Sequence, residues 1–353
     1  MSLKAYNVLV GSGLLAHAQE TIENAGLTGP FLVISQPRIF KAVRRLIGKT
    51  SHYMMIPDGE RAKSMATVGR ILDRAAAMKL TRQSTLIALG GGVVGDVTGF
   101  AASLYMRGIS VVQIPTTLLA QVDSSIGGKT GVNFRNVKNL VGTFHQPRLV
   151  LSDPDSLKSL SDREFANGLY ETLKYGIISD KALFEDFVTD LKQLKQRDSA
   201  VVEKTVARCA EIKARIVAAD EMEGDLRRVL NLGHTVGHAL ESAAEFRRLK
   251  HGEAVGYGMI AAARISLATQ RISSSEAGRM ESAVRAIGAL PSLHGLKIER
   301  IMKALHQDKK VRDGSVHFIL PLEIGRVEIT RDVPLGLVRE TTAALIHESK
   351  TRN

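Results

Sequence analysis

The sequence has one cysteine, no tryptophan and few aromatic residues, and each scarcity excludes a class of protein. Cys209 is the only cysteine among 353 residues, so the chain forms no intramolecular disulfide and builds no zinc site from cysteines. A single cysteine is typical of a protein from the reducing cytoplasm, where we expect this one. Aromatic residues make up 5% of the chain, which disfavours nucleic-acid binding, because single strands stack on aromatic side chains.

Long hydrophobic runs are also missing. No stretch approaches the roughly 18 apolar residues that a membrane-spanning helix needs. The first residues, Met1–Val8, lack the apolar core of a signal peptide and lead into a predicted strand. With 44% hydrophobic and 24% charged residues, the composition is that of a globular protein. At roughly 150 residues per domain, the length predicts about two domains.

The balance between basic and acidic residues is unusual. Lysine and arginine number 48 against 36 acidic residues, which gives a formal charge of +12. Such an excess indicates an anionic partner: nucleic acid, a membrane surface, or a small phosphorylated or carboxylated molecule. The basic residues are scattered rather than gathered into a stripe, which argues against nucleic acid.

The first part of the chain alternates short β-branched runs with helical patterns, which predicts βαβ units and a mostly parallel, Rossmann-like sheet. The predicted strands are Asn7–Val10, Phe31–Ser35, Tyr53–Ile56, Thr85–Leu89, Val111–Ile114 and Leu149–Ser152. The predicted helices between them are Ile39–Ile47, Met65–Met78 and Val93–Tyr105. We therefore expect an α/β domain over residues 1–152, with its ligand crevice at the carboxyl ends of the strands.

After residue 152 the apolar period changes to 3.6, which predicts an all-α domain over residues 153–353. Its predicted helices are Arg163–Ile177, Lys181–Leu191, Ala200–Asp220, His234–Ala244, Glu253–Gln270, Ala277–Ile287 and Ile298–His306. One apolar alternation, Val316–Leu320, is typical of a short hairpin strand.

A glycine-rich turn follows the predicted strand at residues 85–89. Gly90, Gly92 and Gly95 satisfy G-x-G-x-x-G between a strand and a helix, where backbone N–H groups and the helix dipole hold a pyrophosphate. The pattern equally suits a tight turn that only packs helix on strand. No acidic residue ends a strand about 20 positions later to bind a ribose.

Three of the ten histidines fall within 18 positions. His234 and His238 share one helix face at i and i+4, and His251 follows. The zincin motif needs a glutamate where this chain has Thr235, so that class is disfavoured. A catalytic metal site still needs a third ligand, and Glu171 is one candidate, although Glu171 and Lys174 at i and i+3 also suit a surface ion pair. One of the histidines could equally be a buried core residue.

The stretch from Pro115 to Pro147 is long and polar, with little apolar periodicity. We interpret it as a loop, and a loop of this length inside a compact domain is usually functional. Lys129 follows two glycines, Gly127 and Gly128, where the backbone allows close approach of phosphate or carboxylate oxygens.

Together these residues resemble the 3-dehydroquinate synthase family. The resemblance runs in order from about residue 53 to residue 325. It rests on the motifs G-G-G-V-V-G-D, L-N-L-G-H-T-V-G-H-A-L-E and L-K-H-G-E-A-V and on the Pro115–Pro147 block. The chain departs from the family pattern at Phe134–Val137, at Tyr170, where alanine is usual, and at Gln36, where an acidic residue or asparagine often follows the second strand.

The resemblance implies an NAD-binding α/β domain and a helical domain that binds a divalent metal, zinc or cobalt, with the substrate between them. It implies the metal ligands Glu171, His234 and His251. The NAD-binding residues that it implies are Asp58, Gly59, Glu60, Arg61, Ala62, Lys63, Gly92, Val93, Val94, Gly95, Asp96, Thr116, Thr117, Lys129, Lys138, Ser156, Leu157, Lys158 and Ser159.

The resemblance also implies a substrate site and a reaction. The substrate-binding residues are Arg107, Asp123, Lys129, Asn139, Lys174, Lys213, Arg227, Asn231, His238 and Lys310, of which His238, Lys129, Lys174, Arg227 and Asn231 are expected to be catalytic. The implied reaction converts 3-deoxy-D-arabino-heptulosonate 7-phosphate to 3-dehydroquinate and phosphate. It proceeds by NAD-mediated transient oxidation, β-elimination, re-reduction, ring opening and aldol closure.

Three alternatives stay open at this point. Another sugar-phosphate cyclase would act on sedoheptulose 7-phosphate or glucose 6-phosphate with the same cofactors. A metal-dependent polyol dehydrogenase would release NADH, and a basic nucleic-acid-binding protein would need no NAD. We expect a cytoplasmic homodimer whose partner is a small anionic sugar-acid phosphate, with no nucleic acid and no membrane.

Overall fold

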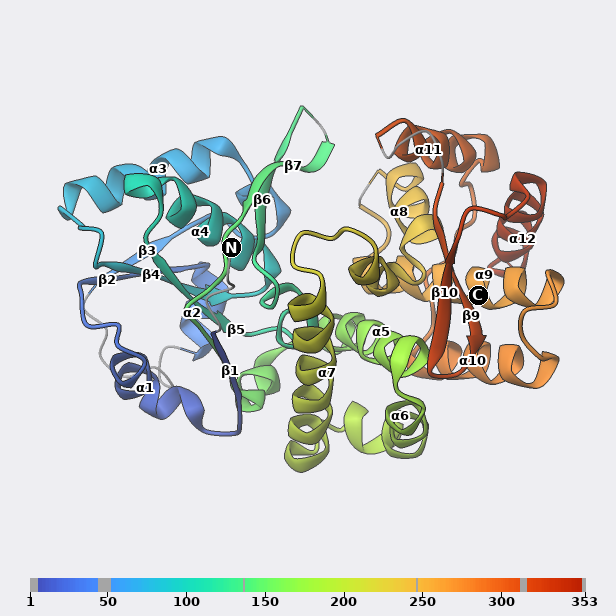
Figure 1. Ribbon diagram of the computed structural model, residues 1–353, viewed down its shortest axis with the longest axis horizontal. Coiled ribbons are helices and arrows are strands. Elements are labelled where there is room, and N and C mark those ends of the chain that lie inside the picture. Colours follow the sequence, from blue (N-terminus) through green and yellow to red (C-terminus); the bar gives the residue numbers. More distant parts are fainter. Residues whose placement is uncertain (1–5, 44–51, 136, 246, 312–315, 351–353) are drawn as a thin grey trace. The chain divides into compact units, whose positions relative to one another are not determined.

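The computed structural model describes residues 6–43, 52–135, 137–245, 247–311 and 316–350, with the backbone alone for 307–311. The chain divides into two compact units (Figure 1). Unit 1 comprises Met1–Phe165 and Arg197–Met222, and unit 2 comprises Ala166–Gln196 and Glu223–Asn353. Unit 1 thus extends beyond residue 152, where the sequence pattern changes, and takes in a later helix. Among the described residues, no helix is both long and apolar enough to cross a membrane.

The centre of unit 1 is a six-stranded sheet in the order β1-β8-β5-β4-β2-β3, and every pair is parallel. The predicted parallel sheet is confirmed. Its strands are β1 (Asn7–Val10), β2 (Phe31–Ser35), β3 (Tyr53–Met55), β4 (Thr85–Gly90), β5 (Ser110–Pro115) and β8 (Leu149–Ser152).

Helices cover both faces of this sheet. They are α1 (Ala18–Asn24), α2 (Pro37–Val43), α3 (Met65–Ala77) and α4 (Gly92–Leu104). Unit 1 also contains the short turns η1 (Leu14–His17), η2 (Glu60–Ala62), η3 (Tyr105–Arg107), η4 (Ala120–Ser124) and η5 (Pro154–Ser159), and the helix α7 (Ser199–Ala219), which contacts η4, η5 and β1. Side chains alternate between the faces along each strand. Leu32 and Leu86 pack with α3 and α4, whereas Val33 and Ile87 pack with α1 and α2. Figure 1 shows α3 and α1 on opposite sides of the sheet.

The predicted polar loop from Pro115 to Pro147 is wrong in part. The turn η4 is followed by an antiparallel hairpin of β6 (Lys129–Phe134) and β7 (Val137–Phe144). Most residues of β7 are exposed on both faces. A strand without a buried face lacks the apolar alternation by which strands are recognised in a sequence.

Unit 2 is helical, as predicted, with one hairpin. Its elements are α5 (Asp162–Ser179, which begins in unit 1), α6 (Lys181–Lys195), η6 (Leu226–Asn231), α8 (His234–Ala243), α9 (His251–Ala268), α10 (Ser274–Ile287), α11 (Ile298–Val311), β9 (Phe318–Glu323), β10 (Arg326–Thr330) and α12 (Leu335–Glu348). Helix α9 is buried along most of its length and packs against α8, α10, α12 and β9. A helix that is apolar all round belongs in the centre of a domain.

An ion-pair network holds three helices of unit 2 together. Arg264 of α9 contacts Glu281 of α10 at 2.8 Å and Glu348 of α12 at 2.6 Å. Arg285 contacts the same two carboxylates. Burial raises the pKa of Glu281, but hydrogen bonds from Arg264 and Arg285 outweigh it and lower that pKa. The hydrogen bond from Arg264 likewise lowers the pKa of Glu348.

Replacing Arg264 by alanine is expected to lower the free energy of unfolding by about 2 kcal/mol, because two partly buried carboxylates lose a charged donor. The pKa values of Glu281 and Glu348 are depressed in the folded chain. The network therefore stabilises above the unfolded value and is lost as the pH falls through the folded values. Denaturant unfolding between pH 7 and pH 3 measures both effects, and the deficit of the variant should shrink at low pH.

A matched control is Arg279→Ala. Arg279 contacts both oxygens of Glu185 at 2.7 and 2.6 Å, but this pair is more than two-fifths exposed. An exposed pair contributes less than about 1 kcal/mol. Equal losses in the two variants would contradict the role assigned to the Arg264 network.

Candidate functional site

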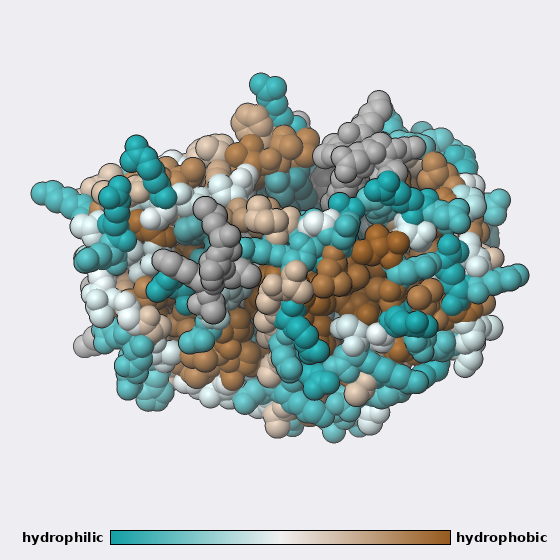
Figure 2. Space-filling view, viewed as in Figure 1, coloured by the Kyte–Doolittle hydropathy of each residue, from teal (hydrophilic) through white to brown (hydrophobic). Residues whose placement is uncertain are grey.

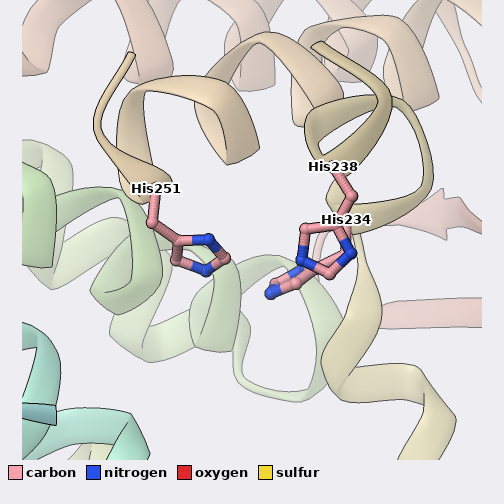
Figure 3. A group of neighbouring side chains, drawn as sticks. All are labelled: His234, His238 and His251. Carbon is pink, nitrogen blue, oxygen red and sulfur yellow. The ribbon is translucent and has the colours of Figure 1, made fainter. Parts of the chain in front are cut away.

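Three histidines gather where two helices of unit 2 begin. His234 is the first residue of α8 and His238 lies one turn later, while His251 is the first residue of α9. One ring nitrogen from each lies within 4.8 Å of those of the others. Figure 3 shows His251 projecting toward the other two rings from the opposite side. Such a cluster of imidazoles is a candidate metal site.

Close packing of the two helices brings these residues together. A Cβ atom on Gly258 of α9 would lie 1.8 Å from the carbonyl oxygen of Gly233, the residue before α8. Gly233 itself has φ +79°, a left-handed conformation that favours glycine. These two glycines therefore allow α8 to start against α9, with the histidines at the contact.

Glu171 of α5 lies beside the histidines and has no exposed surface. Its Oε1 is 3.5 Å from Nε2 of His234 and 3.2 Å from Nε2 of His251. Its Oε2 is 2.5 Å from Nζ of Lys174, whose side chain is 1% exposed. The alternative of a surface ion pair is therefore wrong, because this pair is buried.

The hydrogen bonds of the rings determine which nitrogen faces Glu171. Nδ1 of His234 is 3.1 Å from the carbonyl oxygen of Leu232, and Nδ1 of His251 is 3.2 Å from Oε2 of Glu241. Both acceptors require a proton on Nδ1, which leaves Nε2 as the lone-pair nitrogen. Two imidazole nitrogens and one carboxylate then converge, and this donor set fits a divalent zinc or cobalt ion.

The surroundings of the site shift the pKa values of His234 and His251 in opposite directions. Burial lowers the pKa of His234 to about 3, although Glu171 opposes this shift. Burial also acts to lower the pKa of His251, but hydrogen bonds to Glu171 and Glu241 outweigh it and raise the pKa to about 10. Without a metal, a proton on His251 neutralises part of the carboxylate charge.

Further polar residues of unit 2 lie on η6. Arg227 is buried, with 2% of its surface exposed, and Nδ2 of Asn231 is 3.4 Å from Oε1 of Glu223. A buried guanidinium is a suitable partner for a carboxylate or phosphate. The side chain of Lys310, an expected substrate residue, lies outside the described residues.

In unit 1 the glycine-rich turn joins β4 to α4, as predicted. Helix α4 begins at Gly92, with Gly91 as its N-cap. Gly90 pairs with Pro115, so β4 and β5 end side by side, and the carbonyl oxygen of Gly90 accepts a hydrogen bond from the backbone N–H of Thr116. The expected residues of the turn and of β5 thus lie together at the carboxyl end of the sheet, where open α/β sheets bind ligands.

A buried lysine connects three of the expected segments. Nζ of Lys63 is 2.5 Å from Oδ2 of Asp96 and also hydrogen-bonds Oδ1 of Asn139. Burial raises the pKa of Asp96 above its ordinary value, against the opposing effect of Lys63. Asn133, which we did not expect in the site, joins Glu60 and Asn139: its Nδ2 donates to Glu60 and its Oδ1 accepts from the backbone of Asn139.

Asp123 and Lys213 form a second expected pair. They lie on η4 and α7, and Nζ of Lys213 is 2.7 Å from Oδ1 of Asp123. The turn η4 is π-helical, a geometry often found at functional sites. The structure thus brings together two expected residues that are 90 positions apart.

The other expected residues of unit 1 differ in exposure. Buried ones are Ala62, Val94, Ser156 and Leu157, half-buried ones are Asp58, Val93, Gly95, Thr117 and Lys138, and exposed ones are Gly59, Arg61, Arg107, Lys129, Lys158 and Ser159.

Two departures from the family pattern are accommodated locally. The ring of Tyr170 is buried, and a Cβ atom on Gly256 would lie 2.8 Å from it, so this glycine makes the space that tyrosine needs. Nε2 of Gln36 donates to the carbonyl oxygen of Pro57 at 2.8 Å.

Glu241, like Asn133, is a site residue that the sequence analysis missed. It is buried, and its helical spacing was a usable signal: His234, His238 and Glu241 stand at i, i+4 and i+7, on one face of α8.

The fold and site define a class before any comparison with known proteins. A parallel sheet with a glycine-rich turn and a helical unit with a histidine and carboxylate cluster are typical of enzymes that combine a dinucleotide with a metal. Comparisons give the family. The 3-dehydroquinate synthase N-terminal family matches residues 53–167, and the 3-dehydroquinate synthase C-terminal family matches residues 168–311. The chain belongs to the 3-dehydroquinate synthase family.

Curated relatives agree over nearly the whole length. A 3-dehydroquinate synthase from Nostoc sp. (strain PCC 7120) is 44% identical over 347 residues and covers 96% of each chain. One from Koribacter versatilis is 44% identical over 340 residues, covering 94% of this chain and 93% of the relative.

Among solved structures, 2-epi-5-epi-valiolone synthase from Streptomyces hygroscopicus, with NAD+ and Zn2+ bound, has a TM-score of 0.89 at 30% identity and covers 99% and 98% of the two chains. A 2-deoxy-scyllo-inosose synthase with carbaglucose-6-phosphate, NAD+ and Co2+ has a TM-score of 0.84 at 28% identity and covers 95% of each chain. A probable glycerol dehydrogenase from Sinorhizobium meliloti, at 16% identity, shares the fold, with a TM-score of 0.68 and coverage of 99% and 100%.

Replacing His251 by alanine is expected to weaken Zn2+ binding at least 100-fold, because one of the convergent nitrogens is lost. Competition with a chromophoric chelator measures the affinity. His294→Ala is the control, because His294 is an exposed histidine of the same unit. Unchanged Zn2+ affinity in His251→Ala would remove His251 from the ligand set.

Proposed function

We propose that the chain is a 3-dehydroquinate synthase, a phosphate-eliminating carbon-oxygen lyase that converts 3-deoxy-D-arabino-heptulosonate 7-phosphate to 3-dehydroquinate and phosphate. The observation that carries the proposal is the convergence of Glu171, His234 and His251 in a chain with curated relatives of that name. The product equals the substrate less phosphoric acid, so the reaction has no net redox change.

The cofactors of the proposed enzyme are NAD and a zinc or cobalt ion. Solved relatives that carry NAD+ with Zn2+ or Co2+ support this choice. When bound, NAD supplies a reversible hydride acceptor, and the metal supplies a Lewis acid for a hydroxyl group. The side chains of the protein are proposed to bind and orient the substrate and to move protons.

In unit 2, Glu171, His234 and His251 are the proposed metal ligands. Lys174 holds the carboxylate of Glu171 in place through the buried contact between them. His238 lies within the histidine cluster, and as an imidazole beside the substrate it is suited to move a proton to or from a hydroxyl group.

Basic side chains are the proposed binding groups for the two acidic groups of the substrate. Arg227 is buried and offers a guanidinium fork that matches carboxylate or phosphate oxygens. Lys213 is held by Asp123, so its ammonium group is already oriented before a ligand arrives. Orientation matters here because a phosphate group that leaves and takes a neighbouring proton needs positioning more than a strong base.

The proposed NAD site is the carboxyl end of the sheet in unit 1. The N-terminus of α4 offers backbone N–H groups for the pyrophosphate. The contacts of Lys63 with Asp96 and Asn139 hold the glycine-rich turn, η2 and the β6–β7 hairpin in a fixed relation.

A second candidate function is a different sugar-phosphate cyclase, because two of the solved relatives are 2-epi-5-epi-valiolone synthase and 2-deoxy-scyllo-inosose synthase. The sequence identities favour 3-dehydroquinate synthase. The chain is 44% identical to a curated 3-dehydroquinate synthase, but only 30% and 28% identical to the two solved cyclases. Parallel assays with sedoheptulose 7-phosphate and glucose 6-phosphate separate the two.

With NAD and the heptulosonate phosphate, the pure protein is expected to release phosphate and 3-dehydroquinate in equal amounts without accumulating NADH. Prior removal of metal with a chelator should abolish phosphate release, and added Zn2+ or Co2+ should restore it. A phosphate assay follows phosphate release, chromatography quantifies 3-dehydroquinate, and absorbance at 340 nm detects any NADH. Stoichiometric NADH would favour a dehydrogenase, and full turnover by the metal-free protein would contradict the metal requirement.

We also propose that the protein is a cytoplasmic homodimer. The β6–β7 hairpin carries exposed apolar side chains, Phe134, Val137, Leu140 and Phe144, and Figure 2 shows hydrophobic surface in the region where Figure 1 places that hairpin. Such a patch is a candidate protein interface.

Sedimentation equilibrium is expected to give twice the monomer mass for the wild-type protein. Replacing Leu140 by aspartate is expected to shift the equilibrium toward the monomer. A monomeric wild-type protein would contradict the proposal.

A further inference from the structure

We propose that Glu241 is a positioning residue that orients the imidazole of His251 for the divalent metal. The proposal rests on the metal site of the proposed function and adds a residue outside the ligand set. Glu241 acts through Nδ1 of His251, on the side of the ring opposite the nitrogen that faces Glu171.

The position of Glu241 follows from the helix that carries it. Glu241 lies on α8 on the same face as His234 and His238. Its side chain is buried, with 4% of the residue exposed, and its Oε2 is 3.2 Å from Nδ1 of His251. Burying a carboxylate is costly unless a donor or a cation faces it, and the imidazole of His251 supplies a donor.

The two nitrogens of His251 lie between two carboxylates. Nε2 is 3.2 Å from Glu171 Oε1, and Nδ1 is 3.2 Å from Glu241 Oε2. A metal on Nε2 requires the proton on Nδ1, and Glu241 accepts that proton in a hydrogen bond. A carboxylate in this place fixes the tautomer and the ring orientation and raises the basicity of the ligating nitrogen.

The Nδ1 nitrogen of His234 also faces a hydrogen-bond acceptor, but a different kind of acceptor. Its Nδ1 lies 3.1 Å from the carbonyl oxygen of Leu232, a backbone group that no substitution removes. The acceptor for His251 is a side chain, so its contribution to metal binding is open to mutation.

The backbone at His251 is held independently of Glu241. The N–H of Gly252 donates to Oδ1 of Asn167 at 2.6 Å, and the N–H of Lys250 donates to Oε2 of Glu253 at 2.7 Å. Loss of the Glu241 carboxylate is therefore expected to free the ring of His251 while the start of α9 stays in place.

The test titrates the metal-free full-length protein with Co2+ and with Zn2+. Glu241→Ala is expected to raise both dissociation constants about 10–100-fold and to change the visible absorption bands of bound Co2+. Glu241→Gln keeps an acceptor oxygen of nearly the same shape, so it should fold and lose less affinity than the alanine variant. Glu281→Gln is the control: it weakens the ion-pair network of α9, α10 and α12 and should leave metal affinity unchanged.

Each outcome decides one question. Wild-type affinity and an unchanged Co2+ spectrum in Glu241→Ala would overturn the role of Glu241 while leaving the metal site intact. A wild-type protein that binds neither Co2+ nor Zn2+ would instead overturn the metal site of the proposed function. If Glu241→Ala does not fold, wild-type affinity in Glu241→Gln together with an unchanged Co2+ spectrum overturns the proposal, and a several-fold loss supports it.

Discussion

The centre of unit 2 depends on one buried negative charge. The carboxylate of Glu171 has no exposed surface, and an ionised group in that position is stable only where cations and donors face it. Lys174 supplies a fixed cation on one side, and His234 and His251 face the other. Burial lowers the pKa of His234 against the effect of Glu171, whereas hydrogen bonds to Glu171 and Glu241 outweigh burial and raise the pKa of His251. The groups that face this carboxylate are the ones that we propose as partners of a divalent ion.

Packing makes this arrangement precise. The histidines come from the first turns of α8 and α9, and those turns meet because glycines stand where the helices touch. In unit 1 the same logic applies to strand ends: parallel pairing of β4 with β5 places the glycine-rich turn beside Thr116. In both units many of the chemical groups lie on regular elements or at their ends, which are held more rigidly than long loops.

The sequence predicted the strands of the sheet and most helices, because buried strands and amphipathic helices have strong periodic signals, but α1, α12 and β10 were not predicted. The six strands of the sheet are found within a residue or two at each end. The β6–β7 hairpin was not predicted, since β7 is exposed on both faces. Glu171 was one candidate for the third ligand, and the family resemblance implied it, but spacing in the sequence equally suited an ion pair with Lys174; the fold shows its contacts with two histidines from other helices. Glu241 was missed because its partner lies in the next helix, across a turn.

The discontinuous make-up of unit 1 has a consequence for the order in which the chain is built on the ribosome. Strand β1 pairs with β8, so Asn7 has no partner in the sheet until Leu149 has been synthesised. Helix α7 joins unit 1 only after the segment Ala166–Gln196, which belongs to unit 2, has been made. Such long-range pairing slows folding and leaves apolar strands uncovered for longer. Strand β1 is thus made first but is among the last strands to pair within the sheet.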